Sequence, residues 1–208
     1  MVVTLVGATV AVDLVVTRGG SRNAGYRVVL SRTGDTAVTQ LTAADLDDGA
    51  LRGSALHRDL LARIACANAA GADVLLAIHF NAFEDPSATG AETFYDPARP
   101  FADRNLKLAG SLQAALTAQL NVDDRGVASD EDLAAPTITE AGAAYGHLIE
   151  LGPPAAGWVD TPSAMPGALV EPLFLTAPQE ATLAASASGR ARIARALADG
   201  LGAYFSRS

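Results

Sequence analysis

The sequence predicts a single α/β domain whose mixed or parallel twisted sheet holds about five or six strands flanked by helices. Short β-branched runs bounded by Gly, Asp or Asn recur along the chain, and helical apolar patterns lie between them. The chain has 208 residues, 50% of them hydrophobic, which suits one sizeable core. We therefore expect one domain over residues 1–208, with an atypical or truncated N-terminus over 1–25 and an insertion or active-site loop over 130–166.

Short apolar runs predict the strands. They are VVTLVG (2–7), YRVVLSR (26–32), DVLLAIHF (73–80), AETFYD (91–96), GHLIEL (146–151) and GALVEPLF (167–174). The third and the last are almost continuously apolar, which is typical of central strands covered on both faces. Because strands alternate with helices, we expect these two in the middle of the sheet.

Three segments with helical periodicity lie between or after these runs, at 53–71, 102–121 and 187–205. Each one places apolar side chains on a single face, where they can cover the sheet. These are Leu56, Leu60, Leu61, Ile64 and Ala67; then Leu106, Ala109, Leu112, Leu116 and Leu120; then Ile193, Leu197, Leu201 and Phe205.

Composition and charge exclude several classes of function. A formal net charge of −8 argues against nucleic acid as a partner, because phosphate binding needs clustered Lys and Arg. A single cysteine excludes an intramolecular disulfide and a cysteine-based zinc site. The apolar N-terminus has no basic residue ahead of it and is interrupted by Asp13, so we see no signal peptide and expect no integral membrane segment. We expect a monomer.

Two ionisable side chains lie where ligands of open α/β sheets collect, at the carboxyl ends of strands. His79 ends the predicted strand 73–80, and Glu171 lies within the apolar run 167–174. A carboxylate in such a run is costly unless it is paired or coordinated. His79 is therefore either a hydrogen-bonded core histidine or a metal ligand. Glu171 is either the partner of a buried arginine or a functional carboxylate.

The remaining candidates carry weaker signals. Glu92 follows a turn and either lines the cleft or is solvated, and His57 is expected to be exposed. His147 and Glu150 are three residues apart on a predicted strand, which places them on opposite faces and argues against a shared metal site. Neither a phosphate-binding glycine loop, a HExxH helix nor a GxSxG elbow is present.

Several motifs occur in a fixed order along the chain. They are Arg32 with Asp35, Arg63 with Asn68, His79 with Asn81, the GAETFY run 90–95, the DRGV run 124–127, and Glu171 with Phe174. Together they strongly resemble the zinc-dependent N-acetylmuramoyl-L-alanine amidases, which hydrolyse the amide joining muramic acid to the stem peptide of peptidoglycan. The resemblance covers about residues 24–128 and 165–205.

The resemblance implies a role for each matching residue. His79 would be a zinc ligand and Glu171 the catalytic glutamate, while Asn81 would orient a ring or bind the substrate. If Glu92 lines the cleft, we expect it to contact the substrate as well. Zn²⁺ would be the cofactor, peptidoglycan or muropeptides the partner, and the cell envelope or exterior the place of action. Neutral imidazole suits Zn²⁺, and a carboxylate beside it can take a proton from water and pass it to the leaving nitrogen.

The first 25 residues hold no His and no Glu, whereas the resemblance implies two further zinc ligands there. Two alternatives therefore stand beside the amidase hypothesis. The chain could be a metal-deficient, non-catalytic relic of the fold that binds or regulates cell wall. It could also be a metal hydrolase of altered specificity that recruits Asp13 or His147.

Overall fold

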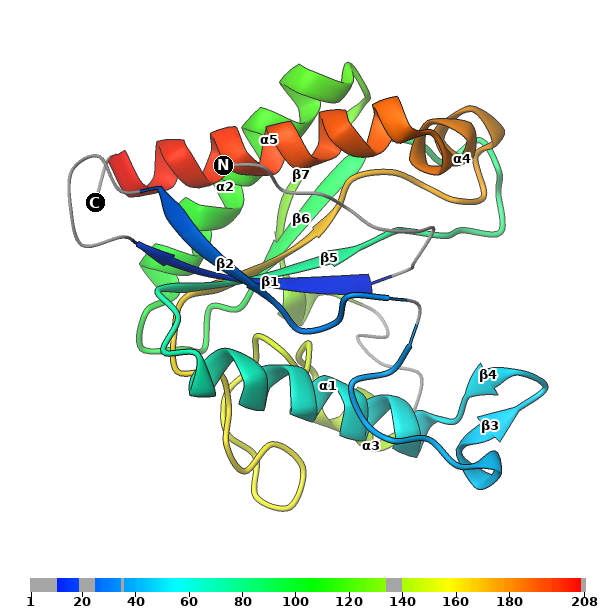
Figure 1. The fold of residues 1–208 in the computed structure, drawn as a ribbon, viewed down its shortest axis with the longest axis vertical. Helices are drawn as coiled ribbons and strands as arrows, with labels where there is room; N and C mark the ends of the chain where they lie inside the picture. The colour runs from blue at the N-terminus through cyan, green and yellow to red at the C-terminus, as the bar shows by residue number, and fades with distance from the viewer. Residues whose placement is uncertain (1–10, 19–24, 35, 134–139, 207–208) are drawn as a thin grey trace.

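A computed structural model describes residues 11–18, 25–34, 36–133 and 140–206. Its centre is a six-stranded sheet with the order β2-β1-β5-β8-β6-β7 (Figure 1). The strands are β1 Ala11–Arg18, β2 Tyr26–Leu30, β5 Val74–His79, β6 Ala91–Tyr95, β7 Asp124–Ser129 and β8 Gly167–Glu171. The predicted strand at 2–7 and the motif residue Asp35 lie outside the described residues.

The strand directions are mixed, as predicted. β5 pairs with β8 in parallel and β6 with β7 in parallel, whereas β1–β2, β1–β5 and β6–β8 are antiparallel. The carboxyl ends of β5 and β8 therefore lie at the same end of the sheet as the amino ends of β6 and β7. The carboxyl ends of β6 and β7 lie at the opposite end.

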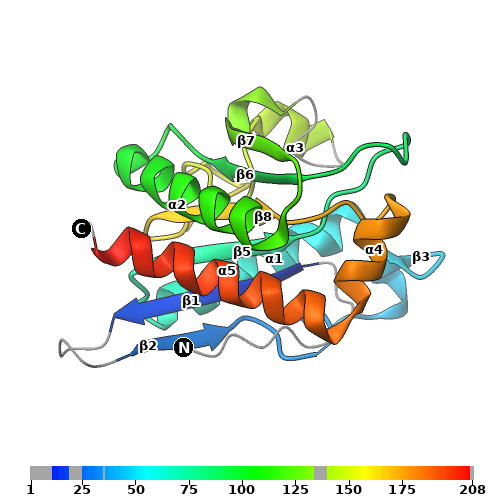
Figure 2. The same ribbon diagram turned by 90° about the horizontal axis from the view of Figure 1, so that it is seen from above.

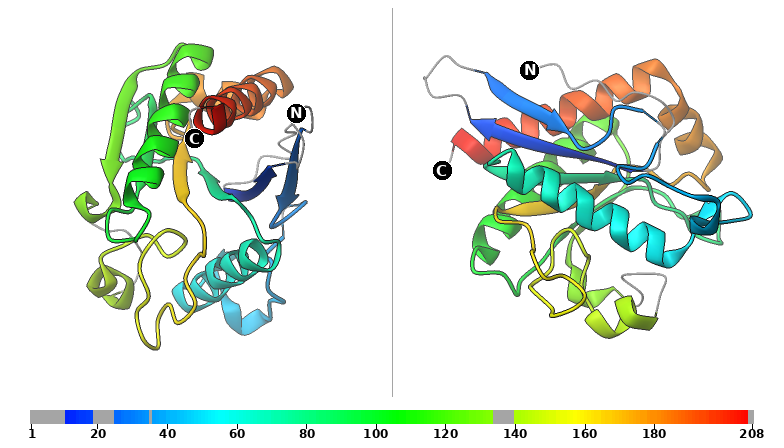
Figure 3. Two further views of the ribbon diagram at one scale, coloured as in Figure 1. Left: turned by 90° about the vertical axis from the view of Figure 1, so that its left-hand side faces the viewer. Right: turned by 60° about the horizontal axis from the view of Figure 1, so that its bottom comes forward.

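Helices cover both faces of this sheet. Helices α2 (Ala102–Leu120) and α5 (Ala187–Ser206) lie side by side on one face, where Leu112, Leu197 and Val170 belong to the largest apolar cluster (Figure 2). Helix α1 (Gly53–Ala69) covers the other face, with Ala67 packed against Leu75 of β5. The segment between α3 (Glu140–Tyr145) and β8 shares that face with α1 (Figure 3).

Short elements complete the chain. A two-stranded ribbon joins β3 (Leu46–Asp47) to β4 (Ala50–Leu51), and single turns of 3₁₀ helix occupy Ala43–Asp45 and Asp130–Asp132. Helix α4 (Pro178–Ala185) begins with proline, whose fixed φ suits the first turn. No helix in the described parts of the chain is long and apolar enough to cross a membrane.

The predicted helices and four of the predicted strands are confirmed, with four differences. Segment 146–151 was expected to be a strand but forms turns, and strands β1 and β7, the second of which contains the DRGV run, were not predicted. Leu106 was expected in the core, yet it is 46% exposed, because Asn105 and Leu108 take the inward positions of α2. The apolar character of 146–151 reflects burial beneath the sheet without strand pairing.

Candidate active site

His79 and Glu171 end two neighbouring parallel strands. Ile78 of β5 pairs with Val170 of β8, so the next residues, His79 and Glu171, lie side by side where the strands end. The period of two along each strand places both on the face that α1 covers. The sequence predicted both residues at the carboxyl ends of strands, and the register of β5 and β8 places them there.

The Glu171 carboxyl lies in surroundings that favour its protonated form. Burial raises its pKa above the usual range, and the neighbouring charge of His79 opposes this rise. The Glu92 carboxylate raises the pKa further, whereas Arg125 and a hydrogen bond from Asn81 lower it. A carboxylate whose pKa is raised toward neutrality is a better general base and acid near neutral pH than an ordinary one.

Asn81 ties the two strand ends together. Its backbone N–H donates to Leu173 O at 3.0 Å, and its carbonyl accepts from the N–H of Leu175 at 2.8 Å. Its side-chain Oδ1 accepts from the N–H of Ala82, which leaves the amide NH₂ group to donate to the Glu171 carboxyl. The described contacts of Asn81 therefore orient Glu171.

Glu92 lies directly opposite Glu171 on the adjoining strand, where the two residues are paired across β6 and β8. Its Oε2 is 3.3 Å from Nε of Arg125, whose guanidinium lies 5.1 Å from the centre of the Phe174 ring. Arg125 thus balances part of the negative charge of the two glutamates. It is half exposed, so it is open to a ligand from solvent.

Glu150 is a site residue that sequence reasoning missed. It is 2% exposed, and its Oε1 lies 3.6 Å from Nε2 of His79. The prediction that His147 and Glu150 occupy opposite faces of a strand was wrong in its premise, because the segment folds into turns after Gly146, which has φ +73°. The N–H groups of Leu151 and Gly152 both donate to Leu148 O, which closes these turns and brings Glu150 to His79.

Glu180 of α4 holds the strand ends in place and was also missed. Its Oε1 accepts from the N–H of Gly90 at 2.8 Å, and its Oε2 accepts from the N–H of Phe174 at 2.7 Å. One buried carboxylate therefore connects the residues just before β6 with those just after β8. Gly90 has φ +107°, and a Cβ there would lie 2.5 Å from Asp123 O, so only glycine fits.

The other residues named from the sequence make different contacts. His57 is half-buried rather than exposed, because its ring stacks on Trp158 with centroids 3.7 Å apart. Asp13 is paired with Ala77 along β1 and β5. His147 contacts Asp96 and a second aspartate in another cluster.

Arg63 and Asn68, on α1, make structural contacts. Arg63 forms a buried ion pair with Asp59, with Nη2 and Oδ2 3.0 Å apart. The Asn68 side chain donates to Pro162 O and accepts from the N–H of Ala164. The two residues hold neighbouring segments against α1.

Comparisons with known proteins identify the family. The sequence profile described as N-acetylmuramoyl-L-alanine amidase (Amidase_3) matches residues 21–203. The N-acetylmuramoyl-L-alanine amidase LytC of Bacillus subtilis (strain 168) is 32% identical over 143 residues, which make up 69% of this chain and 24% of that protein. The chain therefore spans about a quarter of the curated relative it matches.

Solved structures show the same fold. The N-acetylmuramoyl-L-alanine amidase from Clostridium difficile 630 matches with a TM-score of 0.52 and 27% identity, over 71% of this chain and 65% of that one. The CwlD amidase from Clostridioides difficile, solved in complex with the GerS lipoprotein, matches with a TM-score of 0.60 and 20% identity, over 86% and 75% of the two chains. At that identity the second match supports the fold alone.

An imidazole and carboxylates at the ends of central strands of an α/β sheet form a group of side chains suited to hydrolysis. The profile match extends over most of the chain, and the chain belongs to the N-acetylmuramoyl-L-alanine amidase family.

The family is zinc-dependent, and the atoms that His79 and Glu150 offer are of the types that bind zinc. Imidazole nitrogen and carboxylate oxygen are both zinc donors. The His79 and Glu150 atoms face each other at 3.6 Å, close to the roughly 3.3–3.6 Å between ligand atoms bound tetrahedrally at about 2.0–2.2 Å. In the described part of the chain, no third His, Cys or carboxylate joins these two in one compact group.

Proposed function

We propose that this chain hydrolyses the N-acetylmuramoyl–L-alanine amide bond of peptidoglycan. Glu171 is the general base and acid, and His79 and Glu150 hold Zn²⁺. The observation that carries the proposal is the parallel pairing of β5 and β8, which sets His79 beside a Glu171 carboxyl of raised pKa. Since this bond lies in the cell wall, the protein acts outside the membrane.

The residues divide the chemistry between them. Zn²⁺, when bound, supplies Lewis-acid polarisation of the scissile carbonyl and acidifies water. Glu171 takes a proton from the attacking water and delivers it to the nitrogen of the leaving L-alanine. Asn81 keeps the Glu171 carboxyl in position through its hydrogen bond.

Glu92 and Arg125 form the polar wall beside Glu171. Their ion pair at 3.3 Å presents both an acceptor and a donor to a substrate arriving from solvent. In this proposal Asn81 and Glu92 also contact the muropeptide. Segment 130–166 lies against the catalytic end of the sheet through Glu150, which supports its role as an active-site segment.

A Glu171→Gln variant tests the catalytic role. Gln keeps the size of the side chain but cannot exchange the proton, so we expect release of stem peptide from purified muropeptides to fall by about 10²–10⁴-fold in zinc-loaded protein. Mass spectrometry of the released peptides measures this. Glu131→Gln, at an exposed glutamate outside the site, is the matched control. Undiminished release by Glu171→Gln would exclude the role assigned to Glu171.

The metal-deficient relic is the alternative function. It is favoured because, among the described residues, only His79 and Glu150 bring zinc-binding atoms close together at this site. Measurement of zinc in the wild type and in a His79→Ala variant separates the two, because the difference is the zinc that His79 holds. About one zinc per chain more in the wild type supports the enzyme. Glycan binding with no zinc at this site supports the relic.

A further inference from the structure

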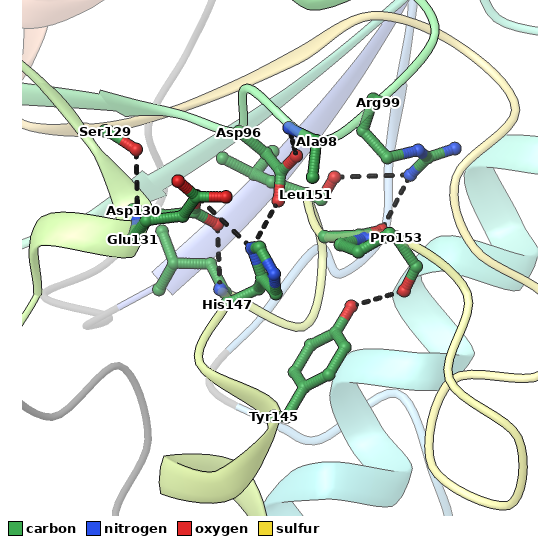
Figure 4. A network of polar contacts seen from close by, with 12 residues as sticks. Asp96, Ala98, Arg99, Ser129, Asp130, Glu131, Tyr145, His147, Leu151 and Pro153 are labelled. Carbon is green, nitrogen blue, oxygen red and sulfur yellow. Dashed lines mark hydrogen bonds and ion pairs between the residues drawn. The ribbon is translucent and has the colours of Figure 1, made fainter.

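A second cluster of metal-binding side chains lies at the opposite end of the sheet from Glu171. Asp96 follows the last residue of β6 and Asp130 follows the last residue of β7. Because β6 and β7 are parallel and Tyr95 pairs with Ser129, the two aspartates leave the sheet next to each other. His147, from the turn segment after α3, completes the group, which we call the buried cluster (Figure 4).

The atoms of the buried cluster converge on one point. Nδ1 of His147 lies 2.9 Å from Oδ2 of Asp96 and 3.7 Å from Oδ1 of Asp130. One ligand atom from each of the three residues lies within 4.8 Å of the others. Ligand atoms bound tetrahedrally at about 2.0–2.2 Å are roughly 3.3–3.6 Å apart, and the two measured distances bracket this value.

These three atoms are buried and satisfy no hydrogen bond. Asp96 and Asp130 are 0% exposed and the His147 side chain is 15% exposed. Among the described residues, none offers Asp96 Oδ2, Asp130 Oδ1 or His147 Nδ1 a contact with hydrogen-bond geometry. The His147 Nδ1 atom lies at ion-pair distance from both aspartates but without hydrogen-bond geometry, so the three atoms face one another in an arrangement that a shared cation would satisfy.

The other carboxylate oxygens are satisfied, and their hydrogen bonds orient the cluster. Asp96 Oδ1 accepts from the N–H of Ala98 at 2.7 Å, and Asp130 Oδ2 accepts from the N–H of Leu148 at 3.0 Å. Each aspartate therefore directs one oxygen toward His147. Backbone donors that fix the outer oxygen of a carboxylate are the supporting contacts expected around a metal ligand.

The charge of the cluster also calls for a cation. Asp96 and Asp130 are both 0% exposed, and two negative charges close together in a buried site are unfavourable. The buried Arg99 guanidinium lies nearby, but it donates to the carbonyl oxygens of Leu151 and Gly152 rather than to the carboxylates. Arg99 therefore leaves the ligand atoms themselves unsatisfied.

We propose that Asp96, Asp130 and His147 bind a divalent transition-metal ion of the zinc type, separate from the zinc of the proposed active site. One imidazole and two carboxylates suit Zn²⁺, whereas Ca²⁺ takes six to eight oxygen ligands. Because both aspartates are 0% exposed, we assign the ion a structural role, and its three protein ligands leave a fourth position for water. The bound ion fastens the 146–151 segment, and with it Glu150, to the carboxyl ends of β6 and β7.

Zinc binding in a His79→Ala background tests this proposal without the active-site metal. Metal-free protein is titrated with Zn²⁺ by calorimetry and with Co²⁺ by visible absorption. We expect about one ion per chain. Adding His147→Gln weakens binding by at least about 100-fold, because loss of a ligand exceeds the 10–100-fold typical of losing a supporting contact. His57→Gln, at a histidine stacked on Trp158, is the matched control and leaves binding unchanged.

Asp130→Asn provides the second variant, because the amide oxygen still accepts the Leu148 N–H and preserves the fold. We expect it to keep its metal-free circular dichroism spectrum and to lose zinc affinity. Absence of zinc binding in the His79→Ala background, or equal affinity in Asp130→Asn, would overturn the proposal. The test measures zinc binding at a site independent of Glu171. Its failure would leave the amidase proposal standing, and failure of the amidase proposal would leave this one standing.

Discussion

Three aspartates of this protein are equally inaccessible to solvent but differ in how completely they are bonded. Asp59 accepts from the N–H groups of Val38 and Thr39 and from the guanidinium of Arg63. Asp96 and Asp130 each keep one oxygen without a hydrogen bond. Burial alone therefore does not identify a metal site. The useful distinction is between a buried charge whose partners are all present and one whose partner is missing.

The largest expected effect is at the fully bonded aspartate. Asp59→Ala leaves the buried Arg63 charge and the Val38 and Thr39 N–H groups without a partner, so we expect a loss of about 3–5 kcal/mol in the free energy of unfolding. Urea titration followed by circular dichroism measures it. The loss should be the same with and without zinc. Arg58→Ala, which breaks an exposed ion pair with Asp45, serves as the control and should have a much smaller effect.

The next effect distinguishes the buried cluster from Asp59. In the His79→Ala background, zinc at about 100 times its Kd should raise the free energy of unfolding by about 2.7 kcal/mol, because it binds the folded state. A chelator should reverse this gain, and Asp130→Asn should lack it. The shift in Tm on adding zinc measures this. An equal shift in the His79→Ala protein with and without Asp130→Asn would mean that zinc binds outside the buried cluster.

The smallest expected effect is the change with pH in the stability that Asp59 contributes. Burial would raise its pKa, but the hydrogen bonds from Thr39, Arg63 and Val38 outweigh burial and lower it below the usual 3.8. The unfolded chain therefore binds more protons than the folded one just below pH 3.8. The stability that Asp59 contributes is complete above this pH and is lost as the pH falls through the folded-state pKa. The stability difference between wild type and Asp59→Asn should shrink in that range; a constant difference would contradict this account.

Much of the fold could be predicted from the sequence, because long periodic segments report which face is buried. The apolar stripe of 187–205 and the continuous apolar run of β5 are cases in point. Strand β7 was missed because it begins with two exposed charged residues and contains Gly126. Segment 146–151 looked like a strand because its apolar side chains are buried, although turns rather than a neighbouring strand satisfy its backbone.

The candidate active site and the buried cluster also differ in how far the sequence predicts them. His79 and Glu171 could be found because each ends a strongly apolar strand and matches an ordered motif. Asp96 carries a weaker signal: it continues the alternation of Glu92 and Phe94 along one face of β6. His147 could not be placed, because its partners are fixed by a turn segment that meets β6 and β7 only in three dimensions.

The pairing of β5 with β8 has a consequence for how this protein folds. The paired residues Leu75 and Gly167 are roughly 90 positions apart in the chain. Contacts of such sequence separation form slowly, because the entropy of closing the loop is lost before the contacts are gained. His79 and Glu171 therefore become neighbours only after the chain has been synthesised beyond β8. A growing chain that ends short of Gly167 carries His79 without the Glu171 carboxyl group beside it.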